Sequence, residues 1–147
     1  MLIIDKDITT VDYGIIAHQV NCKGGIGSGV AKALIDKWSK VKTQYHMFYD
    51  FHKDKFQLLG KYDLVNVEEN VIVFNCFTQF DRGYDGKLYT SYSAIDTCFT
   101  NIGKLQTEYP IHIPYLYGCG LGGGDWEAVK TIIAARCPNV IACRYSP

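Results

Sequence analysis

Two glycine-rich stretches, each lying between an apolar run and a helix-like pattern, constrain the fold of this chain more than any other feature. They are residues 24–29 (GGIGSG) and 118–124 (GCGLGGG), and together they hold nine of the 14 glycines. Tight turns, for which glycine supplies positive φ, account for one or two glycines in each stretch but not for four and five. A glycine-rich turn before a helix exposes backbone N–H groups beside the positive end of the helix dipole. The two stretches are therefore predicted to hold two phosphates, or one diphosphate from both sides.

The remaining residues alternate between strand and helix patterns. Apolar runs indicate strands at 2–4, 15–20, 64–67, 71–77, 111–117 and 140–143. Helical spacing indicates helices at about 30–38, 41–50, 91–105 and 126–136, and residues 80–89 form an exposed loop. This order predicts an α/β fold with a largely parallel sheet covered on both faces. The composition does not change along residues 1–147, so a single domain is expected.

The composition excludes several classes of function. Fifteen basic and fifteen acidic residues give zero formal charge, which argues against a partner held mainly by counterion release, such as bulk nucleic acid. The six cysteines lie mostly in apolar runs, and no secretory pattern begins the chain, so reduced thiols and a cytoplasmic location are expected. The sequence contains no CxxC pair, no zinc-ligand spacing and no apolar stretch near the ~18 residues of a membrane span. No metal, no cofactor and no membrane partner are expected.

The common nucleotide-binding motifs do not fit the glycine-rich stretches. Gly118, Gly120 and Gly123 match GxGxxG, but the dinucleotide fingerprint also needs an acidic residue about 20 positions further on. No acidic residue follows Glu127, and only one further strand is predicted after this stretch. Neither stretch ends in the GK[ST] of a P-loop. Diphosphate binding by loop amides therefore remains, without a classical nucleotide fold.

Three segments in a fixed order resemble the macrodomain family, the ADP-ribose-binding α/β/α module. Residues 6–9 (KDIT) resemble the family's segment after its first strand. Residues 16–21 (IAHQVN), followed by the first glycine-rich stretch, resemble its second strand and first phosphate loop. Residues 113–126 resemble its second phosphate loop. The resemblance implies a three-layer α/β/α macrodomain with a mostly parallel six-stranded sheet. It is nearest to the branch that includes ADP-ribose-1''-phosphate phosphatase and terminal ADP-ribose hydrolase, whose small phage and bacterial members look alike.

The resemblance also implies roles for individual residues. Asp7 would accept a hydrogen bond from the adenine amino group and Ile8 would offer its backbone N–H to the same ring, or else Asp7 simply caps a turn. Asn21 would bind the distal ribose, or else be only the polar end of a buried strand. Tyr145 would cover the adenine, or else be a frayed terminal residue. The expected diphosphate ligands are the two loops: Gly24, Gly25, Ile26, Gly27, Ser28, Gly29, Val30, Gly118, Cys119, Gly120, Leu121, Gly122 and Gly123.

His18, Asn21 and Asp125 are the candidates for chemistry at the distal ribose. His18 matches the histidine of the phosphatase-like branch and could move a proton or steady a departing phosphate, or be a core histidine bonded to backbone. Asp125 could orient a water or simply cap the helix that follows it. The glutamate hydrolases of the family use an aspartate after their Gly-Cys-Gly-Leu motif and a lysine nucleophile. Here Gly122 takes the aspartate position and residues 75–79 contain no lysine, which argues against that mechanism.

The predicted function is ADP-ribose binding with hydrolysis at the distal ribose, as an ADP-ribose-1''-phosphate phosphatase. Two alternatives remain from the sequence: a hydrolase that removes ADP-ribose from protein or nucleic acid, and a non-catalytic ADP-ribose reader. The expected partners are accordingly ADP-ribose or ADP-ribose-1''-phosphate, with ADP-ribosylated protein or nucleic acid as further possibilities. A bacterial or phage-infected cytoplasm is the expected setting.

Overall fold

Six strands form one sheet in the order β1-β6-β5-β2-β4-β3. The computed structural model describes residues 1–105 and 108–146. The strands are β1 (Leu2–Asp5), β2 (Gly14–Asn21), β3 (Tyr62–Glu68), β4 (Val71–Gln79), β5 (Ile111–Pro114) and β6 (Ile141–Arg144). β3 pairs with β4 antiparallel, as a hairpin, and the other pairs are parallel. The mostly parallel six-stranded sheet is therefore confirmed.

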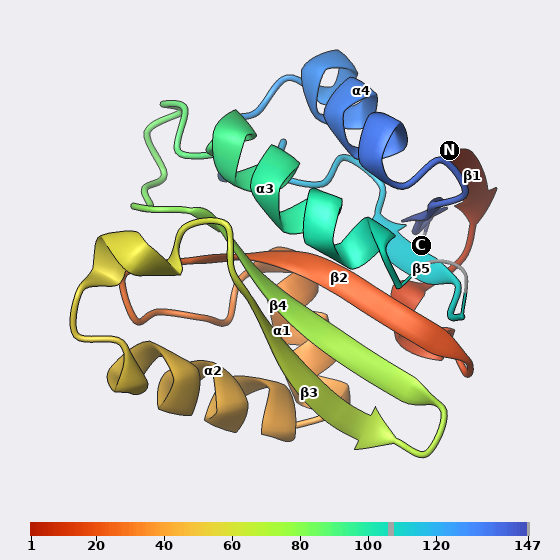
Figure 1. Cartoon of the computed structure of the whole chain (residues 1–147), viewed down its shortest axis with the longest axis horizontal. Helices are drawn as coiled ribbons and strands as arrows, with labels where there is room; N and C mark the ends of the chain where they lie inside the picture. The colour runs from red at the N-terminus through yellow and green to blue at the C-terminus, as the bar shows by residue number, and fades with distance from the viewer. Residues whose placement is uncertain (106–107, 147) are drawn as a thin grey trace.

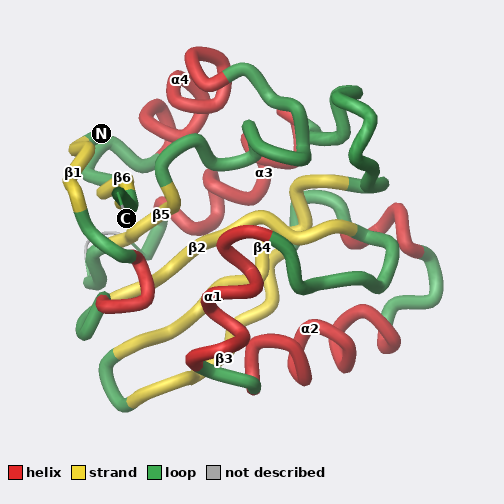
Figure 2. The backbone as a smooth tube through the Cα atoms, turned by 180° about the vertical axis from the view of Figure 1, so that it is seen from behind, coloured by secondary structure: helices red, strands yellow, loops and turns green. Residues whose placement is uncertain are grey.

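Helices cover both faces of this sheet (Figures 1 and 2). Two of them, α1 (Gly29–Lys37) and α2 (Lys40–Phe51), lie on one face. On the other face lie α3 (Tyr92–Gly103) and α4 (Trp126–Arg136). Two short 3₁₀ helices, η1 (Ile8–Thr10) and η2 (Lys55–Leu58), were not predicted from the sequence. Each begins after an aspartate whose carboxylate accepts a backbone N–H. The three-layer α/β/α architecture is confirmed.

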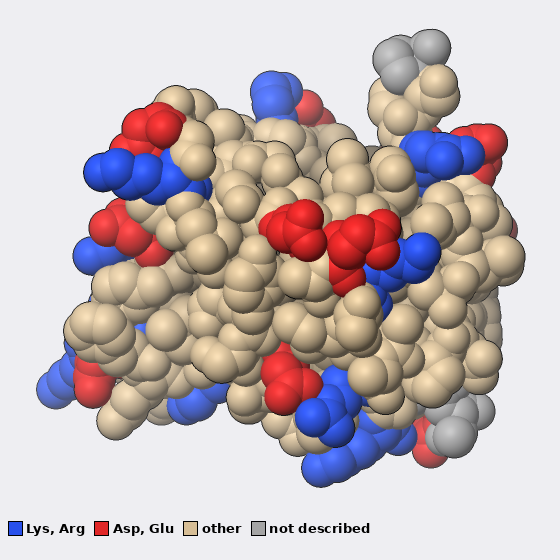
Figure 3. Space-filling view, turned by 90° about the horizontal axis from the view of Figure 1, so that it is seen from above, with Lys and Arg blue, Asp and Glu red and all other residues tan. Residues whose placement is uncertain are grey.

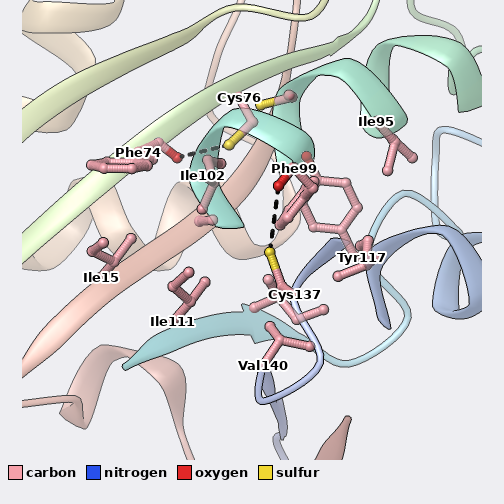
Figure 4. Packing of buried hydrophobic residues seen from close by; sticks show 14 of the residues in the cluster. Ile15, Phe74, Cys76, Ile95, Phe99, Ile102, Ile111, Tyr117, Cys137 and Val140 are labelled. Carbon is pink, nitrogen blue, oxygen red and sulfur yellow. Dashed lines mark hydrogen bonds between the residues drawn. The ribbon is translucent and has the colours of Figure 1, made fainter. Parts of the chain in front are cut away.

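The alternation of side chains along β2 explains why the helices pack on both faces. Ile15 and Ala17 are buried with apolar residues of α3 and α4, whereas Ile16 is buried with Leu34 and Val41 of α1 and α2. Figure 4 shows the first of these clusters, where the thiol of Cys137 lies 3.5 Å from the carbonyl oxygen of Phe99. All six cysteines are free, and five of them are buried. They pack as small apolar side chains.

One strand is shorter than predicted. β5 ends at Pro114 rather than at Tyr117, because the backbone turns there and Tyr117 N–H bonds to the carbonyl of Pro114 at 3.1 Å. Leu116, in this turn, has a φ of 62°, a left-handed conformation that a leucine rarely adopts. Such strain is tolerated where the surroundings enforce it and is common at functional sites.

The parallel strands bring five connections to one edge of the sheet. In sheet order, β1 leads to Asp7, β6 to Tyr145, β5 to the second glycine-rich loop, β2 to the first, and β4 to residues 80–90. Ligands of open α/β sheets bind beyond the carboxyl ends of the strands. This edge is therefore where the site is expected.

Candidate functional site

A cavity of about 500 Å³ opens between the two glycine-rich loops. It lies beyond the ends of β2 and β5, as the parallel topology predicts. Its lining residues are His18, Gln19, Val20, Asn21, Gly25, Ile26, Gly27, Ser28, Gly29, Val30, Ala31, Gln79, Arg82, Gly83, Tyr84, Pro114, Tyr115, Leu116, Tyr117, Gly118, Cys119, Gly120, Leu121 and Gly122. The structure thus brings the two loops together around one space large enough for a small organic ligand.

The charge of the cavity differs from that of the whole chain. None of the residues lining it is an aspartate or a glutamate, although the chain contains 15 of them. Arg82 is its one lysine or arginine. A neutral protein can therefore present an acid-free cavity with one guanidinium, which favours an anionic ligand.

The start of α1 forms one wall of this cavity. Its N-cap residue, Ser28, makes no side-chain capping hydrogen bond within the described chain, and Gly29, Val30 and Ala31 line the cavity. The first N–H groups of a helix have no intrahelical partners, and the helix dipole adds a partial positive charge there. Residues 25–31, which line the cavity here, are seven glycine, serine and apolar residues, so this helix end is suited to a phosphate group.

Asn21 and Tyr45 hold the first loop in its conformation. The Asn21 amide donates to the carbonyl of Gly25 at 2.7 Å, and its oxygen accepts the N–H of Lys23 at 2.9 Å. Tyr45, fully buried in α2, donates its hydroxyl to the Asn21 carbonyl at 2.8 Å and accepts the N–H of Gly24 at 3.1 Å. Asn21 therefore braces the loop as well as lining the cavity.

A hydrogen-bond network anchors the second loop to the end of the sheet. Gln19 donates to Gln79 Oε1 at 2.9 Å and to Thr90 Oγ1 at 3.0 Å, and Thr90 donates to the carbonyl of Gly118 at 2.6 Å. The N–H groups of Tyr89 and Thr90 donate to the carbonyl of Gly122 at 2.7 and 2.9 Å. These bonds fix the backbone of the loop before any ligand arrives.

The same network explains why residue 122 is glycine. A Cβ at that position would lie 2.7 Å from Gln19 Nε2 and 2.8 Å from the carbonyl oxygen of Gly118, and closer still to the Thr90 hydroxyl. Any side chain would therefore displace the network. The space that an aspartate would need is filled by Gln19 and Thr90.

His18 forms part of a buried polar row across three adjacent strands. Its Nε2 lies 2.6 Å from Asn75 Oδ1, and the register places Asn75 beside Asp63 of β3. Since the Asn75 amide nitrogen donates to the carbonyl of Val41, its oxygen is the acceptor and Nε2 of His18 carries the proton. Nδ1 of His18 then has a bare lone pair and, in the described part of the chain, no partner.

Burial moves the pKa values at the two ends of this row in opposite directions. Burial lowers the pKa of His18 from 6.5 to about 4, although its hydrogen bond to Asn75 acts the other way. Burial raises the pKa of Asp63 from 3.8 to about 6, with an opposite effect of the Asn75 side chain. His18 is therefore a neutral imidazole near pH 7, able to accept a hydrogen bond at Nδ1 but not to offer a positive charge.

Asp125 lies outside the cavity lining. Its carboxylate accepts the N–H of Ala128 at 3.0 Å as the N-cap of α4, and its own N–H donates to the Tyr92 hydroxyl at 2.9 Å. The start of α4 is thus capped, in contrast to the start of α1. Only the first of the two glycine-rich loops presents an open helix end to the cavity.

Asp7 and Tyr145 meet in a second, smaller cavity at the β1–β6 edge. This cavity has a volume of about 210 Å³ and is lined by Asp5, Lys6, Asp7, Arg144, Tyr145 and Ser146. Oδ1 of Asp7 accepts both the N–H and the hydroxyl of Thr9, so Asp7 caps η1 while Oδ2 takes no bond within the described residues. Tyr145 is 65% exposed, and Ile8, next to Asp7, is buried.

The other predicted residues shape the loops or pack as apolar side chains. Gly24 and Gly123, with φ of 81° and 70°, lie outside the cavity lining and shape the bends of the loops. Burial raises the pKa of the Cys22 thiol to about 12 and that of Cys119 to about 11. Both thiols are protonated at neutral pH, as expected of apolar packing rather than of a nucleophile.

The described residues contain no group of three or more histidine, cysteine, aspartate or glutamate side chains that could hold a metal ion. Among them, no helix has both the length and the apolar character needed to cross a membrane.

Comparison with known proteins sets this geometry beside solved structures. No family model matches the sequence. An uncharacterized 17.5 kDa protein of the tk-vs intergenic region of Enterobacteria phage T4 is 28% identical over 132 residues, covering 80% of this chain and 76% of that protein. A structure of a protein of unknown function from Bacteroides thetaiotaomicron is 28% identical and has a TM-score of 0.85, covering 99% of this chain and 97% of that one.

A macrodomain protein from Streptomyces coelicolor is 27% identical, with a TM-score of 0.78 and coverage of 99% of this chain and 98% of that one. The chain has the macrodomain fold. DarTG of Thermosipho africanus, whose structure was solved in complex with ADP-ribose, is 15% identical with a TM-score of 0.76. The match to DarTG covers 98% of this chain and 41% of that one.

Several residues that line the cavity of this macrodomain fold were not predicted from the sequence. They are Gln19, Gln79, Arg82, Gly83, Tyr84 and the turn residues 114–117. Gln79 is the last residue of β4 and Arg82 lies three residues beyond it, so their place at a strand's carboxyl end was a usable signal. The turn residues were hidden because their apolar run predicted a longer strand.

Proposed function

We propose that this protein binds ADP-ribose across the carboxyl edge of its sheet. The observation that carries the proposal is the acid-free cavity between two glycine-rich loops, with the open N-terminus of α1 in its wall. Loop amides and a helix end supply the donors that a diphosphate needs. The Thermosipho africanus protein of the same fold was solved with ADP-ribose, which supports this choice among diphosphates.

In this proposal, the smaller cavity binds the adenine and the larger cavity binds the diphosphate and the distal ribose. The adenine lies at the β1–β6 edge, where the free Oδ2 of Asp7 accepts its amino group, the Ile8 backbone lies alongside and Tyr145 covers the ring. The diphosphate lies between the loops over β5 and β2. The distal ribose then falls over β2 and β4, beside Asn21 and His18.

The proposed reaction is hydrolysis of ADP-ribose-1''-phosphate. The oxygen of a water molecule bonds to the phosphorus, and the bond between phosphorus and the ribosyl oxygen breaks. The ribosyl oxygen takes up a proton, so the products are ADP-ribose and inorganic phosphate. The protein supplies mainly rigid positioning and fixed dipoles, which can account for much of a rate enhancement.

His18 has a limited part in this reaction. With a pKa of about 4 it is neutral at pH 7, so it does not neutralise the departing phosphate as a cation. His18 lines the cavity, but its unpartnered Nδ1 is buried, so ligand binding would have to expose this atom before it holds the attacking water or a ribose hydroxyl. Asn21 positions the distal ribose through the loop that it braces.

The residues of this chain do not favour the mechanism of the family's glutamate hydrolases, in which a lysine is the nucleophile. The position of the required aspartate is Gly122, where a Cβ would meet Gln19 and the carbonyl of Gly118. Gln79 ends the strand segment in which the lysine is expected, and its side chain is bonded to Gln19 and to the carbonyl of Asp81. Asp125, turned to capping α4, is the weaker candidate for orienting the water.

Phosphate release tests this proposal against the alternatives. The protein is incubated with ADP-ribose-1''-phosphate, an ADP-ribosylated peptide and an ADP-ribosylated DNA end, while ADP-ribose binding is measured by calorimetry. We expect binding of ADP-ribose and release of inorganic phosphate from the first substrate. Binding of ADP-ribose without phosphate release would indicate a non-catalytic reader. Release of ADP-ribose from the peptide or the DNA end would instead indicate a hydrolase of those adducts.

A further inference from the structure

Residues 82–84, in the segment 80–90, form a third wall of the cavity, which neither glycine-rich loop provides. The Tyr84 hydroxyl lies 3.4 Å from the Ser28 hydroxyl of the first loop. Further along, the N–H groups of Tyr89 and Thr90 bond to Gly122 of the second loop. This segment therefore connects to both loops at the β4 end of the cavity.

Arg82 projects from this wall against the first loop. A Cβ on Gly25 would lie 2.5 Å from Nη1 and 2.6 Å from Cζ of Arg82, so the guanidinium rests against the Gly25 backbone. Gly25 is in turn bonded to the Asn21 side chain at 2.7 Å. The guanidinium thus lies next to the residue proposed to meet the distal ribose.

The donors of this guanidinium are unused. Within residues 1–105 and 108–146, the ion pairs join Lys32–Asp36, Lys87–Asp85, Arg136–Asp96 and Arg144–Asp5, and none involves Arg82. The nearby Asp81 carboxylate accepts the backbone N–H of Arg82 at 2.7 Å rather than its side chain. An unpaired arginine in an acid-free cavity presents a planar set of N–H groups that matches a phosphate.

Sheet order gives the place of Arg82 along the ligand. From β1 to β4 there are four strand spacings, or about 19 Å at 4.8 Å each. Asp7 marks the β1 end and Arg82 the β4 end, with the two loops between them. A ligand with its base at Asp7 and its diphosphate between the loops reaches Arg82 with its last group.

We infer that Arg82 is a specificity-determining residue that binds a phosphate carried on the distal ribose. This rests on the proposed function and deepens it, since it selects phosphorylated ligands over ADP-ribose itself. The loop amides hold the diphosphate in both ligands, whereas Arg82 meets only the additional phosphate. The selectivity of the protein therefore comes from one side chain outside the glycine-rich loops.

Calorimetry with two ligands tests the inference. For the wild type, Arg82→Gln and Arg82→Lys, we measure the Kd of ADP-ribose and the Kd of ADP-ribose-1''-phosphate. Turnover of the second ligand is stopped by cold or followed by phosphate release. The wild type should favour the phosphorylated ligand, and Arg82→Gln should lose about tenfold of that preference with ADP-ribose affinity changed less than threefold. Arg82→Lys should keep part of the preference, because it keeps the charge without the planar fork.

Lys87→Gln is the matched control, since it removes a positive charge from the same segment but outside the cavity lining. It should leave the preference unchanged. The inference is overturned if Arg82→Gln weakens both ligands equally, weakens neither, or behaves like Lys87→Gln. If the wild type binds neither ligand, the proposed function itself fails, which is a different result.

Discussion

At the scale of the residue, the row of His18, Asn75 and Asp63 couples stability to pH in two opposing ways. His18 has a folded pKa below its unfolded value, so its contribution to stability is present above about pH 6.5 and is lost as the pH falls towards 4. Asp63 has a folded pKa above its unfolded value, so its contribution is present below about pH 3.8 and is lost as the pH rises through 6. The two effects offset each other in the wild type.

Replacing Asp63 separates these effects. Near pH 7 the wild type carries a buried, charged carboxylate at this position, whereas Asp63→Asn carries a neutral amide. The stability of the variant relative to the wild type should therefore be about 2 kcal/mol more favourable at pH 7 than at pH 4.5. Urea unfolding at both pH values measures this difference.

The same substitution at an exposed position, Asp50→Asn, serves as the control and should change stability equally at both pH values. If Asp63→Asn also changes stability equally at the two pH values, burial does not raise the pKa of the Asp63 carboxyl above its unfolded value.

Sequence reasoning at this scale found residues that lie in recognisable patterns. Asp7 and Asn21 follow predicted strands and His18 lies near the carboxyl end of one, and each lines one of the two cavities. Arg82 was not found, because an irregular loop has no periodicity from which to predict where a side chain points. The reason for Gly122 was also hidden, because Thr90 and Gln19, which leave no room for a Cβ, lie far from it in the chain.

At the scale of the element, the first glycine-rich loop depends on α2 for its shape. The Tyr45 hydroxyl reaches both Gly24 N–H and the Asn21 carbonyl from within a buried helix face. Buried N–H groups without a partner cost about 1–3 kcal/mol, so the loop conformation is stabilised by this one hydroxyl. The order of strands and helices was predictable from apolar periodicity, but this dependence of a loop on a helix was not.

Removing that hydroxyl should loosen the loop. Tyr45→Phe is expected to lower the free energy of unfolding by about 1–2 kcal/mol and to weaken ADP-ribose binding by about three- to tenfold. Ser91→Ala removes a comparable hydroxyl bond to the N–H of Ala94, at the start of α3 and outside the cavity, and should lower stability by about 1 kcal/mol without changing affinity.

Urea unfolding and calorimetry on both variants check this. Equal affinity losses in Tyr45→Phe and Ser91→Ala would mean that general destabilisation, and not the shape of the first loop, governs binding.

At the scale of the whole molecule, a chain of zero formal charge keeps its acidic groups out of one cavity. Figure 3 shows that red and blue side chains are interspersed across one face, with broad areas of neither kind. Long-range attraction of anions therefore has no large basic surface behind it on that face. The proposed binding of the diphosphate therefore relies on backbone N–H groups and the α1 terminus, with Arg82 reserved for an additional phosphate, all where the parallel strands end. The fold class predicted this edge, whereas the size and charge of the cavity became visible only in three dimensions.

The most direct test of the central claim, that an acid-free cavity between the loops binds the ADP-ribose diphosphate, uses Gly120. A Cβ there meets no other atom within 4 Å, and the residue lines the cavity, so substitution should leave the fold intact. Calorimetry with ADP-ribose compares the wild type with Gly120→Asp and its neutral isostere Gly120→Asn. We predict about 100-fold weaker binding by Gly120→Asp than by Gly120→Asn, or about 2.7 kcal/mol, from repulsion between the carboxylate and the diphosphate. Equal affinities of the two variants would mean that the ADP-ribose diphosphate does not lie between the two loops.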